Sequence, residues 1–544
     1  MRSLPTYLIR STAAAAVLAI SLIAAPAATA QDTGAEPFTY DIMLGLNRLS
    51  DPQVSPDGHW VTYQVREVDP VMGGGGTTVW LQDLTGDAEA RPLFPNGGQG
   101  NTVRWAPDGG TLYFLSSRSG SNQIWATDTE GTEQVQVTDL PFDVQGYKIS
   151  PDGERLVVAL AVYPDCETLA CSVERSEAEA ARSSTGRVYD RMFVRHWDTW
   201  KDGTQNHLFV VSLGADGRAE GDPVWVTRGF DGDTPSKPFG GEEDFTFTPD
   251  GEAIVFSARE AGSTEPWSTD FDLWLTDGLG DSGDFTNLTD SNPAWDAGPV
   301  FSPDGRTLAY RAMSRPGFEA DKFAIMLRDM ETGQVRQIAA NWDRSASSLA
   351  WGPDGNTLYV TAQDTGHYRM FAVDTRNGAV IPFTGEGSVA SSSLTPSGIV
   401  YSLAALDQPG DLWFKTYRGR EMPRRLTEIN PVVGELAFGE AEQFTFEGWN
   451  DETVHAWVIR PANYVEGEKY PVAFLIHGGP QGTFSNNWSW RWNPQTYAGA
   501  GYAVVMIDFH GSVGYGQAFT DSISQHWGDR PLEDLQKGWA HALD

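Results

Sequence analysis

The chain has 544 residues, too many for one ordinary domain and enough for roughly two or three. Its composition, 40% apolar and 20% charged, is that of a globular protein, and its formal net charge is −35. An acidic chain of this kind repels phosphate backbones, so we expect no nucleic-acid partner.

The first thirty residues have the pattern of a secretory signal peptide. Arg2 and Arg10 supply positive charge, Ala13 to Ala25 form an apolar run too short to span a bilayer, and a small-x-small cleavage site ends at Ala30. No other stretch is apolar for long enough to predict a membrane helix. We therefore expect cleavage after Ala30 and export to the periplasm or the medium, with residues 31–49 as an N-terminal segment.

A repeat centred on Pro-Asp-Gly runs through residues 50–430. Its first copy is Ser55 to Gly58, and the prolines of successive copies are 51, 44, 98, 54, 50 and 43 residues apart. Asp-Gly is a tight-turn pair, and strand-like segments flank the copies, four to a repeat. Repeats of this length with four short strands are typical of propeller blades. Seven copies therefore predict a seven-bladed β-propeller.

The gap of 98 residues contains an insertion in blade three, which we place at residues 163–205. It carries Cys166 and Cys171, which we expect to form a disulfide in an exported protein. Too few ligands surround the cysteines for a metal site, so we expect no metal. A helix-like stretch, Ser176 to Arg182, follows them. The insertion is either a surface embellishment or a functional element.

The pattern changes to that of an α/β domain in residues 431–544. Val454 to Ile459 alternates like an edge strand, while Val472 to Ile476 and Tyr502 to Ile507 are apolar runs typical of a parallel sheet. A helical segment, Asn493 to Ala500, lies between the two runs. This order predicts the start of an α/β domain.

Glycine-rich loops follow both apolar runs. The sequence HGGP occupies residues 477–480, and DFHGSVGYG occupies residues 508–516. In α/β-hydrolases a loop of the HGG type donates a backbone N–H to the oxyanion. We therefore expect Gly479 to be this donor, with Gly478 shaping the approach of the substrate.

Together these features resemble the prolyl oligopeptidase family of serine peptidases over residues 36–544. The resemblance implies an all-β seven-bladed propeller followed by the N-terminal part of an α/β-hydrolase domain, with no cofactor. Within the family, the Arg195-to-Asp198 segment, the cysteine pair and Phe509 to Ser512 are most similar to secreted dipeptidyl-peptidases of type V. The acylaminoacyl-peptidase branch comes second, since many relatives carry Pro-Arg-Gly where this chain has Phe-His-Gly.

The catalytic triad of the family is missing from these residues. An α/β-hydrolase needs a G-x-S-x-G elbow followed by Asp and then His, and no serine of the chain lies in that motif. Ser512 comes nearest, but His510 takes the first glycine position. In the family the elbow follows the next strand, so we expect the triad beyond Asp544 and an inactive chain as given. We interpret His477, His510 and His526 as structural.

A dipeptidyl peptidase must hold the free ammonium group of its substrate two residues from the scissile bond. Strand order in a propeller places the insertion, and the loop with Glu242 and Glu243, on the face toward the α/β domain. We therefore expect a carboxylate of Glu242, Glu243 or Asp198 to bind the ammonium group. Trp197 and Trp200 would line its pocket. The alternative is that these residues form a solvated acidic loop.

Three functions remain in competition. The first is a serine peptidase that, in its full-length form, releases dipeptides from the free N-termini of small peptides. The second is an acylaminoacyl-peptidase-like hydrolase, and the third is a non-catalytic periplasmic propeller that binds a partner. The HGGP and GSVGYG loops favour a peptidase, because a binding propeller has no use for them.

Overall fold

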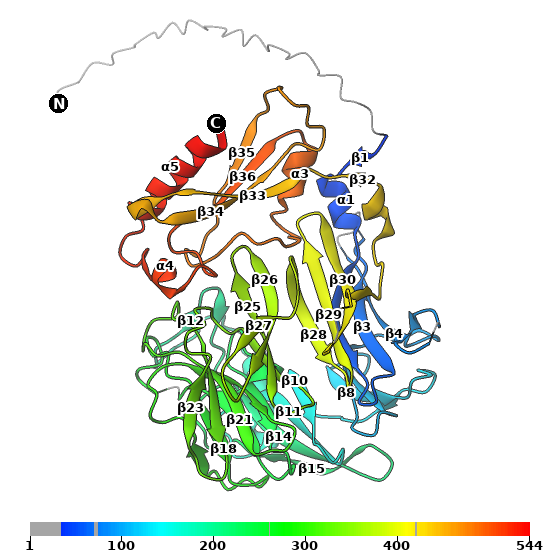
Figure 1. Cartoon of the computed structure of the whole chain (residues 1–544). Coiled ribbons are helices and arrows are strands. Elements are labelled where there is room, and N and C mark those ends of the chain that lie inside the picture. Colours follow the sequence, from blue (N-terminus) through cyan, green and yellow to red (C-terminus); the bar gives the residue numbers. More distant parts are fainter. Residues whose placement is uncertain (1–33, 70–73, 87, 261, 419–420, 544) are drawn as a thin grey trace, which may run out of the picture.

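The computed structural model describes residues 34–69, 74–86, 88–260, 262–418 and 421–543. The predicted signal peptide lies outside these residues. A large strand-rich part extends from β2 to β31, and a smaller mixed sheet with three helices lies above it in Figure 1. In the described part of the chain, no helix is long and apolar enough to cross a membrane.

Apart from a two-stranded hairpin in the insertion, the described strands of the large part form five sheets of four and one sheet of eight. The first sheet contains β2 (Arg48–Val54), β3 (Trp60–Arg66), β4 (Thr77–Asp83) and β5 (Arg91–Pro92); the second, β6 (Asn101–Trp105), β7 (Leu112–Ser116), β8 (Gln123–Thr127) and β9 (Val135–Gln136); the third, β10 (Gly146–Ile149), β11 (Arg155–Val162), β14 (Gln205–Leu213) and β15 (Ala219–Trp225). The fourth contains β16 (Phe245–Phe247), β17 (Ile254–Ala258), β18 (Asp272–Thr276) and β19 (Phe285–Asn287); the fifth, β20 (Asp296–Phe301), β21 (Thr307–Ala312), β22 (Ala324–Asp329) and β23 (Val335–Ile338). The sheet of eight joins β24 (Ser348–Trp351), β25 (Thr357–Asp364), β26 (His367–Asp374) and β27 (Val380–Pro382) to β28 (Ser388–Leu394), β29 (Gly398–Ala405), β30 (Gln408–Thr416) and β31 (Arg424–Arg425).

The sheet of eight consists of two antiparallel halves. A single parallel pair, Tyr368 and Ser388, joins β26 to β28. The large part is therefore built from seven four-stranded antiparallel units, one for each copy of the repeat.

The Pro-Asp-Gly turns form for the reasons the sequence suggests. In the first turn, the hydroxyl of Ser55 donates to Asp57 Oδ1 (2.5 Å), and the same oxygen accepts the backbone N–H of His59 (3.0 Å). Gly58 has a φ of +76°, a conformation that favours glycine. The turn thus connects β2 to β3 tightly.

The first unit lies against the last. A side chain at Gly109 would place its Cβ 3.8 Å from Pro56 of the preceding turn, and one at Gly58 would place it 2.9 Å from Pro396 of the last turn. The first and last turns are therefore neighbours, although they are far apart in the sequence. The two units share an apolar cluster that includes Val61, Tyr63, Val65, Val400 and Leu412.

The C-terminal sheet has the strand order β33, β34, β36, β35. Its strands are β33 (Ala441–Glu447), β34 (Thr453–Ile459), β35 (Val472–Leu475) and β36 (Ala503–Asp508), and β35 runs parallel to β36. Two short strand pairs remain: β1 (Glu36–Pro37) pairs with β32 (Leu436–Ala437), and β12 (Arg195–His196) pairs with β13 (Thr199–Trp200). The α-helices are α1 (Tyr40–Gly45), α2 (Leu169–Ala180), α3 (Pro494–Gly499), α4 (Gln517–Asp521) and α5 (Arg530–Leu543). The 3-10 helices are η1 (Glu242–Asp244), η2 (Pro431–Glu435) and η3 (Trp449–Asp451).

Polar contacts fasten the segment after β36 to loops of the fifth sheet and of the sheet of eight. Arg315 forms two hydrogen bonds with the carboxylate of Asp521 on α4, at 2.7 and 2.9 Å. The backbone N–H of Thr365 donates to Gly514 O at 3.1 Å. These contacts hold the DFHGSVGYG segment over one side of the large part.

Candidate active site

The HGGP loop presents a free backbone donor. Within the described residues, no hydrogen bond involves the N–H of Gly479, and this residue is exposed. Its φ is +131°, and a Cβ would lie 2.6 Å from the nitrogen of Gln481, so only glycine fits. At Gly478 an added Cβ would meet no atom within 4 Å, which leaves space in front of the loop.

His477 fixes the peptide unit that carries this donor. Its Nδ1 lies 2.9 Å from Gly478 O, and burial lowers its pKa, so the ring is neutral and donates to that carbonyl. In a trans peptide the C=O and the next N–H point in opposite directions. Holding Gly478 O against the His477 ring therefore turns the N–H of Gly479 away from it, toward solvent.

The two glycine-rich loops support each other. Asp508, at the end of β36, accepts the N–H of Phe484 at 2.6 Å and the hydroxyl of Tyr515 at 2.5 Å. Burial raises the pKa of Asp508 to about 7. The N–H of Val513 donates to Gly482 O at 2.9 Å. The residues that follow the HGGP loop are thus held by the end of β36 and by the segment after it.

Ser512, His477 and Asp508 come together, but they do not form a working triad. His477 Nε2 lies 2.9 Å from Ser512 Oγ and 3.8 Å from Asp508 Oδ1. Ser512 is completely buried, and its hydroxyl is also within hydrogen-bond distance of Phe509 O (2.7 Å). A serine without exposed surface cannot attack a substrate, so this group braces the loop. The interpretation of His477 as structural agrees with this geometry.

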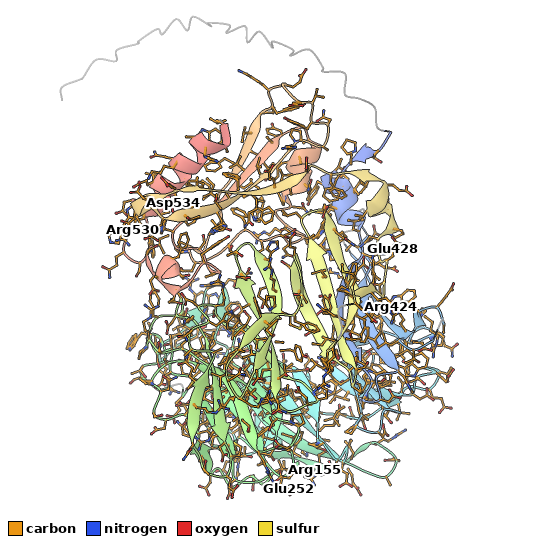
Figure 2. All side chains as sticks on the ribbon, viewed as in Figure 1. Arg155, Glu252, Arg424, Glu428, Arg530 and Asp534 are labelled. Atoms are coloured by element: carbon orange, nitrogen blue, oxygen red, sulfur yellow. A yellow bond between two sulfur atoms is a disulfide. The ribbon has the colours of Figure 1, made fainter. Side chains whose placement is uncertain are left out.

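His510 belongs to a separate buried network that the sequence did not suggest. Its Nδ1 lies 2.7 Å from Asp534 on α5, and its Nε2 lies 3.3 Å from Glu452. Burial disfavours the charged ring, but the two carboxylates outweigh it and raise the pKa of His510. Asp534, labelled on α5 in Figure 2, also accepts the backbone N–H groups of His510 and Trp449, both at 2.6 Å. In the sequence, the only sign of this network is an acidic residue, Asp534, among the core-facing positions of α5.

A cavity of about 430 Å³ lies next to the HGGP loop. Gln481, two residues beyond Gly479, lines it from the C-terminal part, and Phe193 and His196 line it from the insertion. The insertion therefore lies beside the HGGP loop. The other polar residues that line the cavity include two carboxylates, Glu265 and Glu319, and the side chains of Arg259, Ser268 and Thr269.

The expected acidic residues lie in different surroundings. Glu242, in η1, pairs with Arg104 (2.7 Å), which also pairs with Asp51 at 3.0 Å. Neither Glu242 nor Glu243 is among the residues that line the cavity. Asp198 is exposed at the turn between β12 and β13.

The two expected tryptophans both lie on the β12–β13 hairpin. Trp197 is 74% exposed, and its ring lies 5.6 Å from that of His196, which lines the cavity. Trp200 is 55% exposed, and its ring faces Tyr189 at 6.2 Å. The structure therefore brings Trp197 to the edge of the cavity and directs Trp200 to another part of the insertion.

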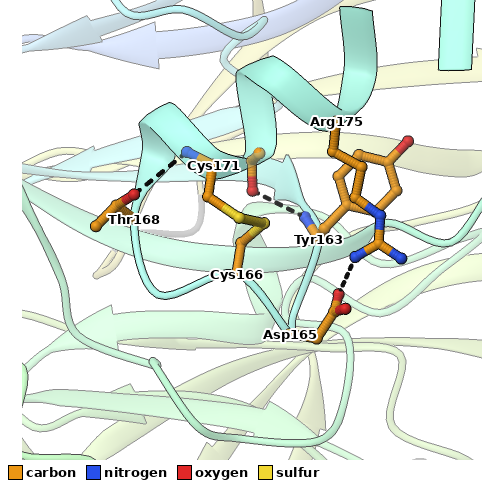
Figure 3. The surroundings of a disulfide bond; sticks show 7 residues. Tyr163, Asp165, Cys166, Thr168, Cys171 and Arg175 are labelled. Carbon is orange, nitrogen blue, oxygen red and sulfur yellow. Dashed lines mark hydrogen bonds and ion pairs between the residues drawn. A yellow bond between two sulfur atoms is a disulfide. The ribbon is translucent and has the colours of Figure 1, made fainter. Parts of the chain in front are cut away.

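The insertion begins with the disulfide region shown in Figure 3. Cys166 and Cys171 are bonded, with an S–S distance of 2.05 Å. The side chain of Thr168 accepts the N–H of Cys171 (3.2 Å) and starts α2. Among the described residues, no group of His, Cys, Asp and Glu side chains could hold a metal ion.

Comparison with known sequences decides the family. A sequence profile described as "Prolyl oligopeptidase family" matches residues 488–544. The chain is 30% identical over 492 residues to a dipeptidyl-peptidase 5 of Aspergillus fumigatus, covering 85% of this chain and 67% of that protein. The chain belongs to the prolyl oligopeptidase family. A second member, the probable dipeptidyl-peptidase 5 of Aspergillus clavatus, is 29% identical over 561 residues, 96% of this chain and 74% of the relative. The resemblance to this family of serine-type peptidases is confirmed.

Solved structures with the same fold include other peptidases. An acylaminoacyl peptidase of Pyrococcus horikoshii has a TM-score of 0.72 and 18% identity, over 93% of this chain and 72% of that chain. A puromycin-hydrolyzing peptidase of Mycobacterium tuberculosis has a TM-score of 0.62 and 18% identity, over 93% and 73%. At this identity the likeness concerns the fold alone.

Proposed function

We propose that this member of the prolyl oligopeptidase family releases dipeptides from the free N-termini of small peptides. The 544 residues supply the oxyanion donor and the substrate cradle. The seven four-stranded units act as the blades of a propeller that limits access to small peptides. Because no serine lies in G-x-S-x-G, a polypeptide of these residues alone is inactive. The signal-peptide pattern supports export, and mature protein beginning at Gln31 would test it.

The chemistry is that of an acyl-enzyme. In a form that carries a nucleophilic serine, the hydroxyl attacks the peptide carbonyl carbon while a histidine takes its proton. The C–N bond then breaks, and the histidine returns the proton to the leaving amine. Water, giving its proton to the same histidine, attacks the ester carbonyl; the C–O bond to the serine breaks, the serine regains a proton and the dipeptide is released. The N–H of Gly479 stabilises the negative oxygen of the tetrahedral intermediate, a contribution of about 10²–10³ in kcat for one donor.

The observation that carries the dipeptidyl assignment is the pair of carboxylates beside Gln481. A dipeptide spans at most about 7 Å, so its ammonium group lies close to the loop that holds its scissile carbonyl. Glu265 already pairs with Lys201 at 2.5 Å. Glu319 is exposed, and among the described residues its carboxylate forms no ion pair or hydrogen bond. Glu319 is therefore the preferred partner of the ammonium group.

The carboxylates expected from the sequence are the second choice for this role. Glu242 is committed to Arg104, and binding a substrate instead would break this partly buried ion pair and leave the guanidinium with Asp51 alone. Within the described residues, neither Glu243 nor Asp198 forms an ion pair with an arginine. Comparing Glu319→Gln with Glu242→Gln, Glu243→Gln and Asp198→Asn separates the two choices.

The test uses a form of the protein that carries the nucleophile. We expect Glu319→Gln to lower kcat/KM for a free-amino dipeptidyl anilide by at least about tenfold, since a charge-assisted hydrogen bond is lost. The N-acetylated substrate should be cleaved poorly by both proteins. Glu252→Gln is the matched control, because this glutamate is exposed near Arg155 in a Pro-Asp-Gly turn (Figure 2). Faster cleavage of the N-acetylated substrate would instead favour an acylaminoacyl-peptidase.

A further inference from the structure

A cluster of exposed aromatic rings borders the cavity beside Gln481. We define the aromatic platform as Phe193, His196, Trp197 and Phe239. Their ring centroids are 5.3–5.6 Å apart in four pairs. Phe193 and His196 line the cavity, and so does a further tryptophan, Trp267. The platform therefore continues into the cavity that reaches the HGGP loop.

These rings are exposed to a degree that the fold does not require. Trp197 is 74% exposed, Phe239 is 66% exposed and Trp267 is 69% exposed. Single exposed apolar side chains are ordinary, but a contiguous group at a cavity indicates a binding surface. Trp197 and Phe239, whose ring centroids are 5.3 Å apart, form such a group, and Trp267 lines the cavity that the platform borders.

The backbone holds Trp197 in this position at a cost. Trp197 is the first turn residue between β12 and β13, and its φ is +50°, a region in which bulky residues are rare. The side chain of Arg195 donates to Trp197 O at 2.7 Å and stabilises the turn. The Trp197 side chain gains little burial in return, so packing in this chain does not offset the strain.

The hairpin that carries Trp197 is fixed to the fourth sheet. Lys201, just after β13, pairs with Glu265 at 2.5 Å, and its N–H donates to Val194 O at 3.0 Å. The Lys201 ammonium group also lies 5.5 Å from the centroid of Phe193. The platform is thus held in place before a ligand arrives, which lowers the entropic cost of binding.

We propose that the aromatic platform binds an aromatic or large apolar side chain on the N-terminal residue of a peptide. This inference rests on the proposed dipeptidyl function and adds the class of side chain that is selected. The carboxylates of Glu265 and Glu319 line the same cavity and suit a free ammonium group. The adjacent rings suit the side chain on the same residue, in edge-to-face or offset-stacked contact. A second copy of the chain is disfavoured, since its net charge of −35 would bring like charges to these glutamates.

The experiment measures binding to the 544-residue chain without its signal peptide. The probes are the peptides Phe-Ala-Gly and Gly-Ala-Gly, both with a free amino end, in isothermal titration calorimetry. We expect Phe-Ala-Gly to bind about tenfold more tightly, because one aromatic side chain becomes buried against the platform. Trp197→Ala and Trp267→Ala should each reduce this ratio to about threefold or less. Trp492→Ala is the matched control, because Trp492 is 66% exposed and does not line the cavity.

The outcomes separate this inference from the proposed function. Equal binding of the two peptides overturns the platform and leaves the peptidase proposal intact. A ratio that survives both tryptophan variants also overturns the platform. Failure of both peptides to bind at millimolar concentration contradicts the proposal that these residues form the substrate cradle. Because Trp197 and Trp267 are largely exposed, both variants retain the fold, and their circular dichroism checks this.

Discussion

Asp534 should hold α5 on the C-terminal sheet, and Asp534→Ala should release it. The side chain is completely buried and accepts three hydrogen bonds, from the N–H groups of Trp449 and His510 and from the His510 ring. Each backbone donor left unsatisfied in a buried site costs about 1–3 kcal/mol. Removing one partner of a buried ion pair costs about 3–5 kcal/mol, and these two figures describe overlapping losses. We therefore expect the local stability of α5 to fall by about 3–5 kcal/mol.

Hydrogen exchange measured by mass spectrometry reports this local stability. In Asp534→Ala, peptides that cover α5 should exchange at least about a hundredfold faster than in the wild type, since 1.4 kcal/mol is a factor of ten. Asp529→Ala is the matched control, because it removes the exposed pair with His526 (3.0 Å) from the same region. Exposed pairs contribute little, so less than about a twofold change is expected there. Equal exchange in the two variants would refute the role assigned to Asp534.

Four further predictions concern the loop, the nucleophile, the disulfide and pH. In a form that carries the nucleophile, Gly479→Pro should lower kcat by about 10²–10³, and unchanged turnover in the folded variant would refute the donor role. A serine-directed fluorophosphonate should label no residue of the 544-residue polypeptide, and stoichiometric labelling of one serine would contradict this. Secreted protein should contain no free thiol at Cys166 and Cys171, whereas a titre of two would exclude the disulfide. Since the pKa of His510 is raised, the stability of its network is present at low pH and lost as pH rises above about 6.5, so His510→Gln should remove this pH dependence.

The sequence predicted those features that depend on neighbouring residues. The Asp-Gly pairs predicted the turns correctly, because the hydrogen bonds and the positive φ that a turn needs all come from five consecutive residues, such as Ser55 to His59. The strand expected at Val454 to Ile459 is β34, Thr453–Ile459, and the helix expected at Asn493 to Ala500 is α3, Pro494–Gly499. Apolar periodicity and an Asn cap were sufficient there.

Features that depend on distant residues were not predictable from one sequence. Glu242 pairs with Arg104, which lies 138 residues away, so no local pattern revealed that this carboxylate is already engaged. The helix expected at Ser176 to Arg182 is α2, Leu169–Ala180, which begins earlier because Thr168 caps it beside the disulfide. Glu319 had no motif around it, and only the cavity with Gln481 distinguishes it from the other acidic residues of this chain.

The packing of the first unit against the last sets a minimum time for folding during synthesis. The first unit completes its packing only when the last unit has been made, 338 residues later. At about 5–20 residues per second, a ribosome needs roughly 17–70 s to bridge that interval. Throughout this time the apolar side chains of β3 have no partner from β29 and β30. The first unit of a nascent chain therefore cannot complete its packing until most of the chain has been made.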